Sequence, residues 1–180
     1  MHKETSKYRD TQEKYSDPER EKWLYANRNK VLSLDELFEV GNSFYGNQNL
    51  LSLYNMPPKL MFERGIRILG RTAIECSIDS HAKEIAKNAN KVRSIFSLTE
   101  DPILIDLFSG SCNLLYHLSN AINPCRTIAF ENDHAIYNLT KHNLEIIDFH
   151  CEFYHGDYSE LISKISFPQK TVPIVLIVSP

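Results

Sequence analysis

The sequence lacks the features that mark membrane, secreted and zinc-binding proteins. Its 180 residues include no run of about 18 consecutive apolar residues, the length that a membrane-spanning helix needs. No apolar segment typical of a secretory signal lies near the N-terminus, so we expect an intracellular protein that is not secreted. The four cysteines form no Cys-x-x-Cys pair and no zinc-like spacing, which favours reduced structural thiols at positions 76, 112, 125 and 151.

The histidines form no metal-binding pattern either. The spacings of four of them place no pair on one helix face together with a supporting acid: His134, His142, His150 and His155. We therefore predict no metal site.

A strong excess of one charge is also missing, although the charges are unevenly distributed. The net charge is −3, and 42% hydrophobic with 24% charged residues is typical of a globular chain of one domain, or of one domain with an extension. Residues 59–98 contain eight basic and four acidic residues, whereas residues 99–180 contain four basic and ten acidic ones. The basic segment could contact a phosphate backbone. A solvated helix face explains the same excess equally well.

Glycine is scarce, and one of the six glycines lies in the most informative stretch of the chain. The apolar run 102–105 leads into Asp106 and then into a turn of small residues that contains Gly110. An amphipathic run follows, which is typical of a buried parallel strand that passes through a tight turn into a helix. Backbone N–H groups at the start of such a helix point at the turn, and open α/β sheets bind ligands at the carboxyl ends of their strands.

Three more apolar runs follow at intervals that suit intervening helices. The predicted strands cover 102–106, 126–130, 151–155 and 172–178, and the predicted helices lie near 111–122, 133–146 and 158–166. This alternation predicts a parallel sheet with right-handed crossovers, that is, an α/β fold. Glu131 lies at the end of the second strand, close to the offset at which such folds present an acid to a ribose.

The first 98 residues are expected to be mainly helical. Residues 1–58 form a polar extension in which 1–15 look disordered, and Ser16 begins a short helix. Ser33 begins another helix that Gly41 is expected to end, and 41–58 follow as a loop. Residues 59–98 form a helical segment before the sheet. Its helix from Asp79 to about Phe96 is expected to bury Ala82, Ile85, Ala86, Ala89, Val92 and Ile95.

Four segments in this order resemble the motif set of class I S-adenosylmethionine-dependent methyltransferases: DLFSGSCN at 106–113, AFEND at 129–133, HGDY at 155–158 and IVLIVSP at 174–180. Within that class the chain looks most like the trimethylguanosine synthase group, which methylates N2 of guanine in the RNA cap. Phe62–Ile66 (FERGI) is similar to a segment that precedes the cofactor domain in that group. The resemblance implies a Rossmann-like fold, S-adenosylmethionine as cofactor and a capped RNA as partner. It also implies that the protein is located in the nucleus if it comes from a eukaryote, and in the cytoplasm otherwise.

The resemblance also assigns residues to roles. Asp106 approaches the methionine end of the cofactor, Glu131 binds the ribose and Asp157 accepts from the adenine amino group. The remaining cofactor-binding positions are Phe108, Gly110, Ser111, Asn113 and Tyr158, and Phe130 is an alternative to Tyr158 for packing against the adenine ring. Ser179 and Pro180 correspond to the start of the family's catalytic Ser-Pro-Pro-Trp motif, which holds the amine and stacks on the base.

Two departures from the family pattern are visible. Cys112 replaces a second glycine, and we expect its Cβ to narrow the loop. The chain stops at Ser179-Pro180, whereas the family has three more strands. The resemblance therefore implies a truncated domain that is inactive alone. We expect such a domain to have an open sheet edge that a protein partner could cover. Two alternatives stay open: a degenerate module that binds a cofactor or partner without catalysis, and a methyltransferase of another substrate class.

Overall fold

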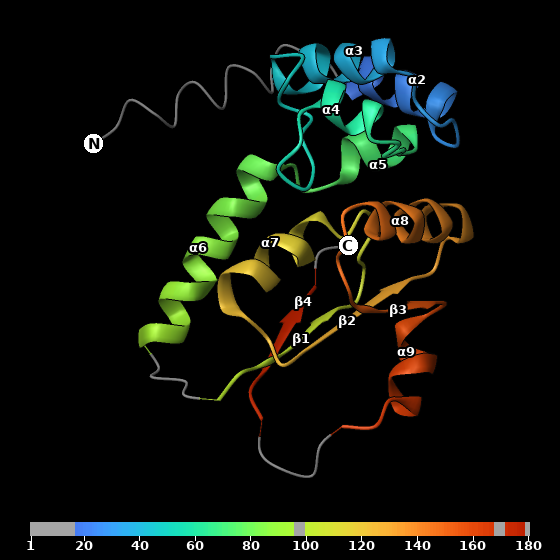
Figure 1. Ribbon diagram of the computed structural model, residues 1–180. Coiled ribbons are helices and arrows are strands. Elements are labelled where there is room, and N and C mark those ends of the chain that lie inside the picture. Colours follow the sequence, from blue (N-terminus) through green and yellow to red (C-terminus); the bar gives the residue numbers. More distant parts are fainter. Residues whose placement is uncertain (1–16, 96–99, 168–171, 179–180) are drawn as a thin grey trace.

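A computed structural model describes residues 17–95, 100–167 and 172–178 of the chain. A group of short helices from the first part of the sequence lies above an α/β domain built from the second part (Figure 1). The predicted disorder of residues 1–15 and the predicted helix start at Ser16 lie outside the described residues.

The α/β domain contains the four predicted strands in one parallel sheet. They are β1 (Ile103–Asp106), β2 (Arg126–Glu131), β3 (Glu152–His155) and β4 (Ile174–Ile177). Their order is β3-β2-β1-β4, so the chain moves outward from β1 on one side and returns to pair β4 on the other. The Rossmann-like α/β prediction is confirmed, and the point at which the strand order reverses lies beside β1, where such sheets bind ligands.

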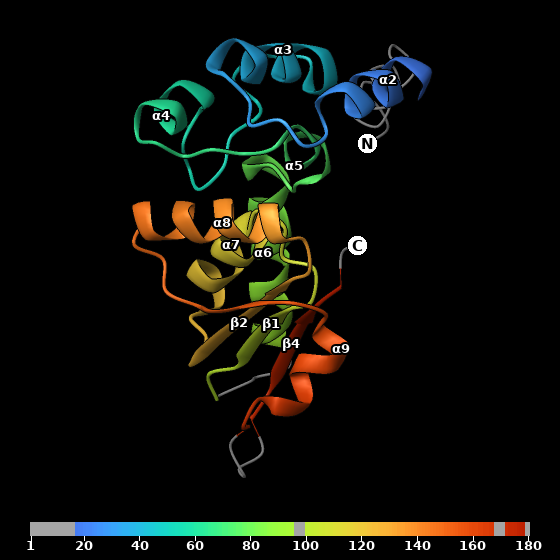
Figure 2. The ribbon, with the colours of Figure 1, turned by 90° about the vertical axis from the view of Figure 1, so that its right-hand side faces the viewer.

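The crossover helices divide between the two faces of the sheet (Figure 2). They are α7 (Asn113–Ile122), α8 (His134–Ile146) and α9 (Tyr158–Leu161), the last continued by the 3₁₀ turn η1 (Ile162–Lys164). Strand residues such as Leu104 and Ala129 pack in the core that contains residues of α7 and α8. Their neighbours Ile105 and Phe130 point to the opposite face and pack against residues of α9 and η1. The alternation follows from the period of two along a strand.

Between residues 17 and 75, which the structure describes, four helices lie above the sheet. They are α2 (Asp17–Asn27), α3 (Leu34–Tyr45), α4 (Pro58–Glu63) and α5 (Gly70–Glu75). The predicted capping box is present at the start of α3, where the Ser33 hydroxyl accepts from the Glu36 N–H and the Glu36 carboxylate accepts from the Ser33 N–H. α5 lies within residues 59–98, which we expected to be helical, but the sequence did not predict a separate helix of six residues there.

Gly41 does not end α3, contrary to our prediction. The helix runs through this position and ends at Gly46, which has a φ of 79° in the left-handed region. The glycine at position 41 serves a different purpose, since a Cβ there would lie 2.6 Å from the carbonyl oxygen of Gln48. The chain after α3 therefore folds back onto the helix, and only glycine leaves room for that contact.

The loop between α3 and α4 enters the core. Leu51, Leu53 and Tyr54 are at most 3% exposed, and they belong to the same cluster as Leu104 of β1 and Leu115 of α7. The first part of the chain and the α/β domain thus share one hydrophobic core. Among the described residues, no helix combines the length and the apolarity that crossing a bilayer requires.

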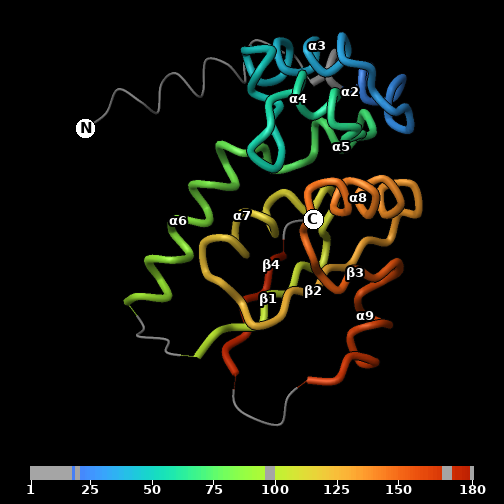
Figure 3. The backbone as a smooth tube through the Cα atoms, viewed as in Figure 1, coloured from blue at the N-terminus to red at the C-terminus, as the bar shows by residue number. Residues whose placement is uncertain are grey.

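The helix α6 (Asp79–Ile95) covers the predicted range but buries only part of the predicted face. Three residues that we expected to be buried are between 45% and 74% exposed: Ile85, Val92 and Ile95. Ala82 and Ala86 are buried, and α6 packs mainly against α7, beside which it runs in the backbone trace (Figure 3). The Asp79 carboxylate lies 2.8 Å from Nε2 of His117 in α7, and both side chains are buried. This buried polar contact joins the N-terminal end of α6 to α7.

Candidate functional site

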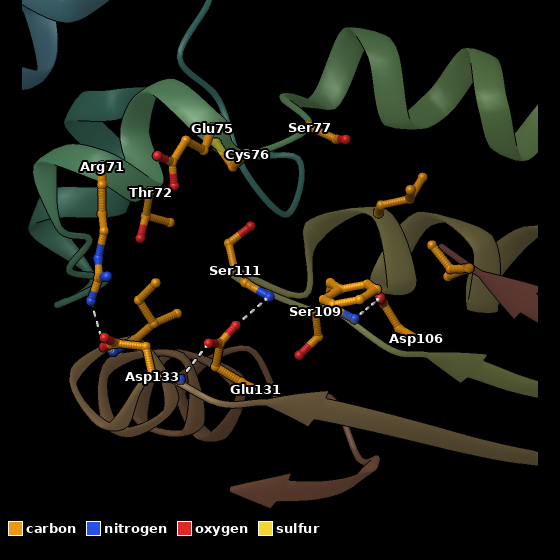
Figure 4. A pocket seen from close by; sticks show the side chains of 15 residues that line it. Arg71, Thr72, Glu75, Cys76, Ser77, Asp106, Ser109, Ser111, Glu131 and Asp133 are labelled. Carbon is orange, nitrogen blue, oxygen red and sulfur yellow. Dashed lines mark hydrogen bonds and ion pairs between the residues drawn. The ribbon is translucent and has the colours of Figure 1, made fainter. Parts of the chain in front are cut away.

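A cavity of about 490 Å³ lies at the carboxyl ends of β1, β2 and β4, beneath α5. Five of the eight predicted cofactor-binding residues line it: Asp106, Phe108, Gly110, Ser111 and Glu131. The other wall consists of residues from α5 and the segment after it, together with the start of α8 (Figure 4). The volume lies in the range of about 300–1,000 Å³ that is usual for pockets that bury a small molecule.

Asp106 ends β1 at the floor of the cavity and is 3% exposed. Its carboxylate accepts from the N–H of Phe108 at 3.1 Å. Burial raises the pKa of this carboxyl to about 7, the Phe108 N–H opposes the rise, and the negative charge of Glu131 adds to it. A buried carboxyl with a pKa near neutrality is poised to pair with a cationic ligand group, because such a group restores the charged form.

Glu131 ends β2 and joins two loops through its carboxylate. One oxygen accepts from the N–H of Gly110 at 3.0 Å, and the other accepts from the N–H of Asp133 at 2.7 Å. Each carboxylate oxygen has a second lone pair, so both can still accept from a ligand. Two oxygens with free lone pairs at a fixed spacing suit a pair of neighbouring hydroxyl groups.

The turn after β1 leaves open space above its backbone. Gly110 has a φ of 49°, and a Cβ built on it would meet no atom within 4 Å, so the glycine faces the cavity. Two hydrogen bonds hold the turn in place: the Ser109 hydroxyl donates to the Phe130 carbonyl at 2.8 Å, and the Thr140 hydroxyl donates to the Gly110 carbonyl at 2.8 Å. A ligand can therefore approach the backbone here closely.

Cys112 adopts the backbone conformation of the glycine that it replaces in the family pattern. Its φ of 57° lies in the left-handed region, at the N-cap position of α7. Our expectation that its Cβ narrows the loop is not met at the cavity, because the side chain is fully buried in the core below and is not among the lining residues. The strain of a left-handed non-glycine residue is offset by the burial of its sulfur.

Asn113 lies away from the cavity, although we predicted it as a cofactor-binding residue. Its amide oxygen accepts from the Tyr54 N–H at 2.7 Å, and its amide nitrogen donates to the Ser77 carbonyl at 2.7 Å. The Tyr54 hydroxyl in turn donates to the carbonyl of Ser111. In this structure Asn113 ties the loop after α3 and the segment before α6 to the turn that shapes the cavity.

Asp157 and Tyr158 lie at the start of α9 and do not line the cavity. The Asp157 carboxylate caps α9 by accepting from the N–H of Ser159 at 2.8 Å, and together with the Ser159 hydroxyl bond this contact lowers the pKa of Asp157. The Tyr158 ring contacts the cavity-lining ring of Phe108 edge to face, with 5.3 Å between centroids. Phe130, the alternative to Tyr158, points to the face of the sheet that α9 and η1 cover, opposite to the face covered by α7 and α8.

Sequence reasoning missed the residues of α5. Arg71, Thr72, Glu75 and Cys76 line the cavity opposite the strand ends, and Arg71 pairs with Asp133 at 2.5 Å between Nη2 and Oδ1 (Figure 4). The Arg71 guanidinium lowers the pKa of Asp133 by this hydrogen bond. A six-residue helix whose N-cap residue makes no side-chain cap hydrogen bond carries no recognisable start signal in the sequence.

The described part of the chain contains no group of three or more histidine, cysteine, aspartate or glutamate residues that could hold a metal ion. The predicted catalytic residues Ser179 and Pro180 lie outside the described residues.

Comparisons with known proteins find similarity only among solved structures. No protein-family model matches the sequence, and no curated protein matches it significantly. A type I restriction-modification methyltransferase subunit from Streptococcus thermophilus matches 56% of this chain and 22% of its own, with 16% identity and a TM-score of 0.43. A human N-acetylserotonin methyltransferase in complex with S-adenosylmethionine matches 69% of this chain and 34% of its own, with 18% identity and a TM-score of 0.28.

The chain thus spans about a fifth to a third of the length of these two structures. TM-scores below 0.5 do not establish a family or an activity, so the function is argued below from the cavity.

We predict that Asn113→Ala destabilises the fold. The substitution leaves the buried Tyr54 N–H and Ser77 carbonyl without their partner, and each such loss costs about 1–3 kcal/mol. Urea unfolding followed by circular dichroism measures the change. Asn90→Ala is the matched control, because Asn90 is exposed on α6 and should change the free energy of unfolding little. An equally small effect of both substitutions would contradict the role assigned to Asn113.

Proposed function

We propose that this chain is an S-adenosylmethionine-dependent methyltransferase domain and that the cofactor occupies the cavity at the strand ends. The observation that carries the proposal is that Asp106, the Gly110 turn and the Glu131 carboxylate all face one cavity of about 490 Å³. These are the positions to which the motif resemblance assigns the methionine end, the close backbone approach and the ribose.

The chemistry of the lining residues fits this cofactor. The Glu131 oxygens, fixed by the N–H groups of Gly110 and Asp133, suit the two ribose hydroxyls. Four acids line the cavity, which suits a ligand with an ammonium and a sulfonium group: Glu75, Asp106, Glu131 and Asp133. The open space above Gly110 admits the ligand to the backbone.

The reaction that we infer is transfer of a methyl group to an amine. When bound, the cofactor supplies a methyl group on a positively charged sulfur. Asp106, the Gly110 turn and Glu131 would hold this cofactor. The transfer would join its methyl carbon to the amine nitrogen, leave the electron pair of the broken sulfur–carbon bond on sulfur and release one amine proton to solvent. Such an in-line displacement depends on alignment, which can be worth about 7–11 kcal/mol of the barrier. The residues of this chain therefore act by holding the reactants in line.

Guanine N2 of RNA, above all of the 7-methylguanosine cap, is the acceptor that we propose. The proposal rests on the resemblance of residues 106–113, 129–133, 155–158 and 174–180 to the trimethylguanosine synthase motifs, in which Ser179 and Pro180 would hold the amine. The excess of basic residues in 59–98 supports a ligand that carries phosphates.

A binding module without catalysis is the second candidate, and one observation favours it. β4 is an edge strand of the described sheet. Three apolar side chains in and directly after it are between 51% and 59% exposed: Ile174, Leu176 and Val178. An apolar strand edge of this kind is suited to pairing with another polypeptide. A protein partner on β4 is compatible with either candidate.

The cofactor proposal predicts that the chain binds S-adenosylhomocysteine and that Glu131→Gln weakens this binding. The amide cannot accept at both atoms, and the loss of hydrogen bonds to a charged acceptor costs about 1–3 kcal/mol. Isothermal titration calorimetry measures both affinities. Glu145→Gln, on an exposed residue of α8, is the matched control. A folded wild-type chain that shows no binding at millimolar ligand would refute the cofactor proposal.

The raised pKa of Asp106 predicts a pH dependence for the same binding. Below its pKa of about 7 the carboxyl is neutral, and above it the carboxylate attracts the cationic groups of the cofactor. The affinity for S-adenosylmethionine should therefore rise about tenfold between about pH 6 and about pH 8. With Asp106→Asn the affinity should stay constant over this interval. A wild-type affinity that falls or stays flat as the pH rises would contradict the pairing of Asp106 with a cation.

The acceptor proposal predicts transfer of labelled methyl groups from S-adenosylmethionine to RNA that carries a 7-methylguanosine cap. Because the resemblance implies that the 180 residues are inactive alone, the assay uses the chain extended through a Ser-Pro-Pro-Trp motif and the strands that follow it in the family. RNA of the same sequence without a cap is the control and should take up much less label. Equal labelling of both RNAs would move the acceptor away from the cap, and labelling of proteins or small amines alone would support a different substrate class.

A further inference from the structure

Arg71 stands out because it is the only cation among the lining residues, all of which belong to the described part of the chain. The cavity is also lined by four residues with carboxyl groups: Glu75, Asp106, Glu131 and Asp133. A cavity with this composition would favour cations everywhere except at Arg71. Any anionic group of a ligand is therefore expected to lie next to this guanidinium.

The backbone at Arg71 is bonded to the turn that follows α2. The Gly70 N–H donates to the Lys30 carbonyl at 2.9 Å, and the Arg71 N–H donates to the Arg28 carbonyl at 3.3 Å. A Cβ at position 70 would lie 2.3 Å from the carbonyl oxygen of Asn27, so only glycine permits this contact. These contacts place the Arg71 side chain over the cavity before any ligand binds, which lowers the entropic cost of using it.

The Arg71 guanidinium pairs with a carboxylate through one nitrogen, and another of its nitrogens has no hydrogen-bond partner among the described residues. Its Nη2 pairs with Oδ1 of Asp133 at 2.5 Å, and Asp133 is itself fixed as the N-cap of α8 by accepting from Ala135 and Ile136. The Arg71 residue is 9% exposed, and its Nε is buried with no hydrogen-bond partner among the described residues. Native structures rarely leave a buried donor unpaired, so the Arg71 guanidinium keeps hydrogen-bonding capacity beyond its pair with Asp133.

We propose that Arg71 is the oxyanion-binding residue of the cavity and that its guanidinium donates to a carboxylate or phosphate oxygen of the bound ligand. A planar guanidinium binds such groups with two parallel hydrogen bonds where geometry allows. S-adenosylmethionine carries one anionic group, the carboxylate of its amino-acid part, and a nucleotide acceptor carries phosphates. The carboxylate form of the proposal rests on the proposed cofactor, whereas the phosphate form does not.

Two variants and two pairs of ligands test the proposal by calorimetry. Arg71→Gln removes the charge, and Arg71→Lys keeps the charge opposite Asp133 but removes Nε–H. S-adenosylhomocysteine is compared with 5′-methylthioadenosine, which lacks the carboxylate. 7-Methylguanosine monophosphate is compared with 7-methylguanosine, which lacks the phosphate. Arg64→Gln removes an exposed guanidinium outside the cavity and serves as the matched control. Thermal melting of every variant confirms that it is folded.

The expected result is that Arg71→Gln lowers the affinity for S-adenosylhomocysteine about 10- to 100-fold, the scale of a hydrogen bond to a charged group, and leaves 5′-methylthioadenosine unchanged. Arg71→Lys should lower the same affinity by a smaller factor. If the affinity falls only for the monophosphate, the oxyanion is a phosphate of the acceptor, which also supports the proposal.

Equal loss of affinity for both members of each pair would assign Arg71 a purely structural role and overturn the proposal. No loss for any ligand would overturn it as well. If the folded wild-type chain binds neither adenosine ligand, the proposed cofactor is wrong, and the phosphate pair then decides alone whether Arg71 binds an oxyanion.

Discussion

The carboxylate of Glu131 makes the hydrogen bonds on which the shape of the cavity depends. It accepts from Gly110 in the turn after β1 and from Asp133 in the turn after β2, and so holds two loops that are distant in the sequence at a fixed separation. Asp133 extends the connection, because it caps α8 and pairs with Arg71 of α5. One series of polar contacts thus runs from the floor of the cavity to its roof.

This arrangement gives the first helices of the chain a role in the site. α5 contributes Arg71 and Glu75 to the cavity, and the helices before it hold its backbone in place. Asn113 fixes the loop at Tyr54 and the segment at Ser77 to the start of α7. Because the two parts of the chain share one hydrophobic core, the site cannot form from the α/β part alone.

The sequence was sufficient to predict the elements that have strong local signals. The four strands are short apolar runs that end in polar residues, and the Gly110 turn follows the first of them, so the sheet and the strand-end acids Asp106 and Glu131 were predictable. The other features depend on contacts between distant segments. Gly41 was interpreted as a helix end because the sequence does not show that Gln48 packs against it. The buried face of α6 was only partly predicted, because the sequence does not show that Asp79 pairs with His117 or that Ile85, Val92 and Ile95 are exposed.

The site was predictable to a similar extent. The strand-end carboxylates of Asp106 and Glu131 can be located in the sequence. Arg71, on the opposite wall of the cavity, comes from a six-residue helix whose N-cap makes no side-chain hydrogen bond. Asn113 follows the glycine turn at the position of a binding residue, but its amide is engaged by Tyr54 and Ser77, which are 59 and 36 positions away. Local patterns therefore located one wall of the cavity, and only the tertiary fold located the other.

The central claim is that a nucleoside cofactor binds between the strand ends and α5. Titration of the ¹⁵N-labelled chain with S-adenosylhomocysteine, followed by the backbone amide resonances, tests it most directly. We predict saturable shifts at Gly110, Ser111, Asp133 and Arg71, with little change at exposed positions of α6 such as Lys87. Shifts confined to surfaces away from the cavity, or none in a folded chain at millimolar ligand, would contradict the claim.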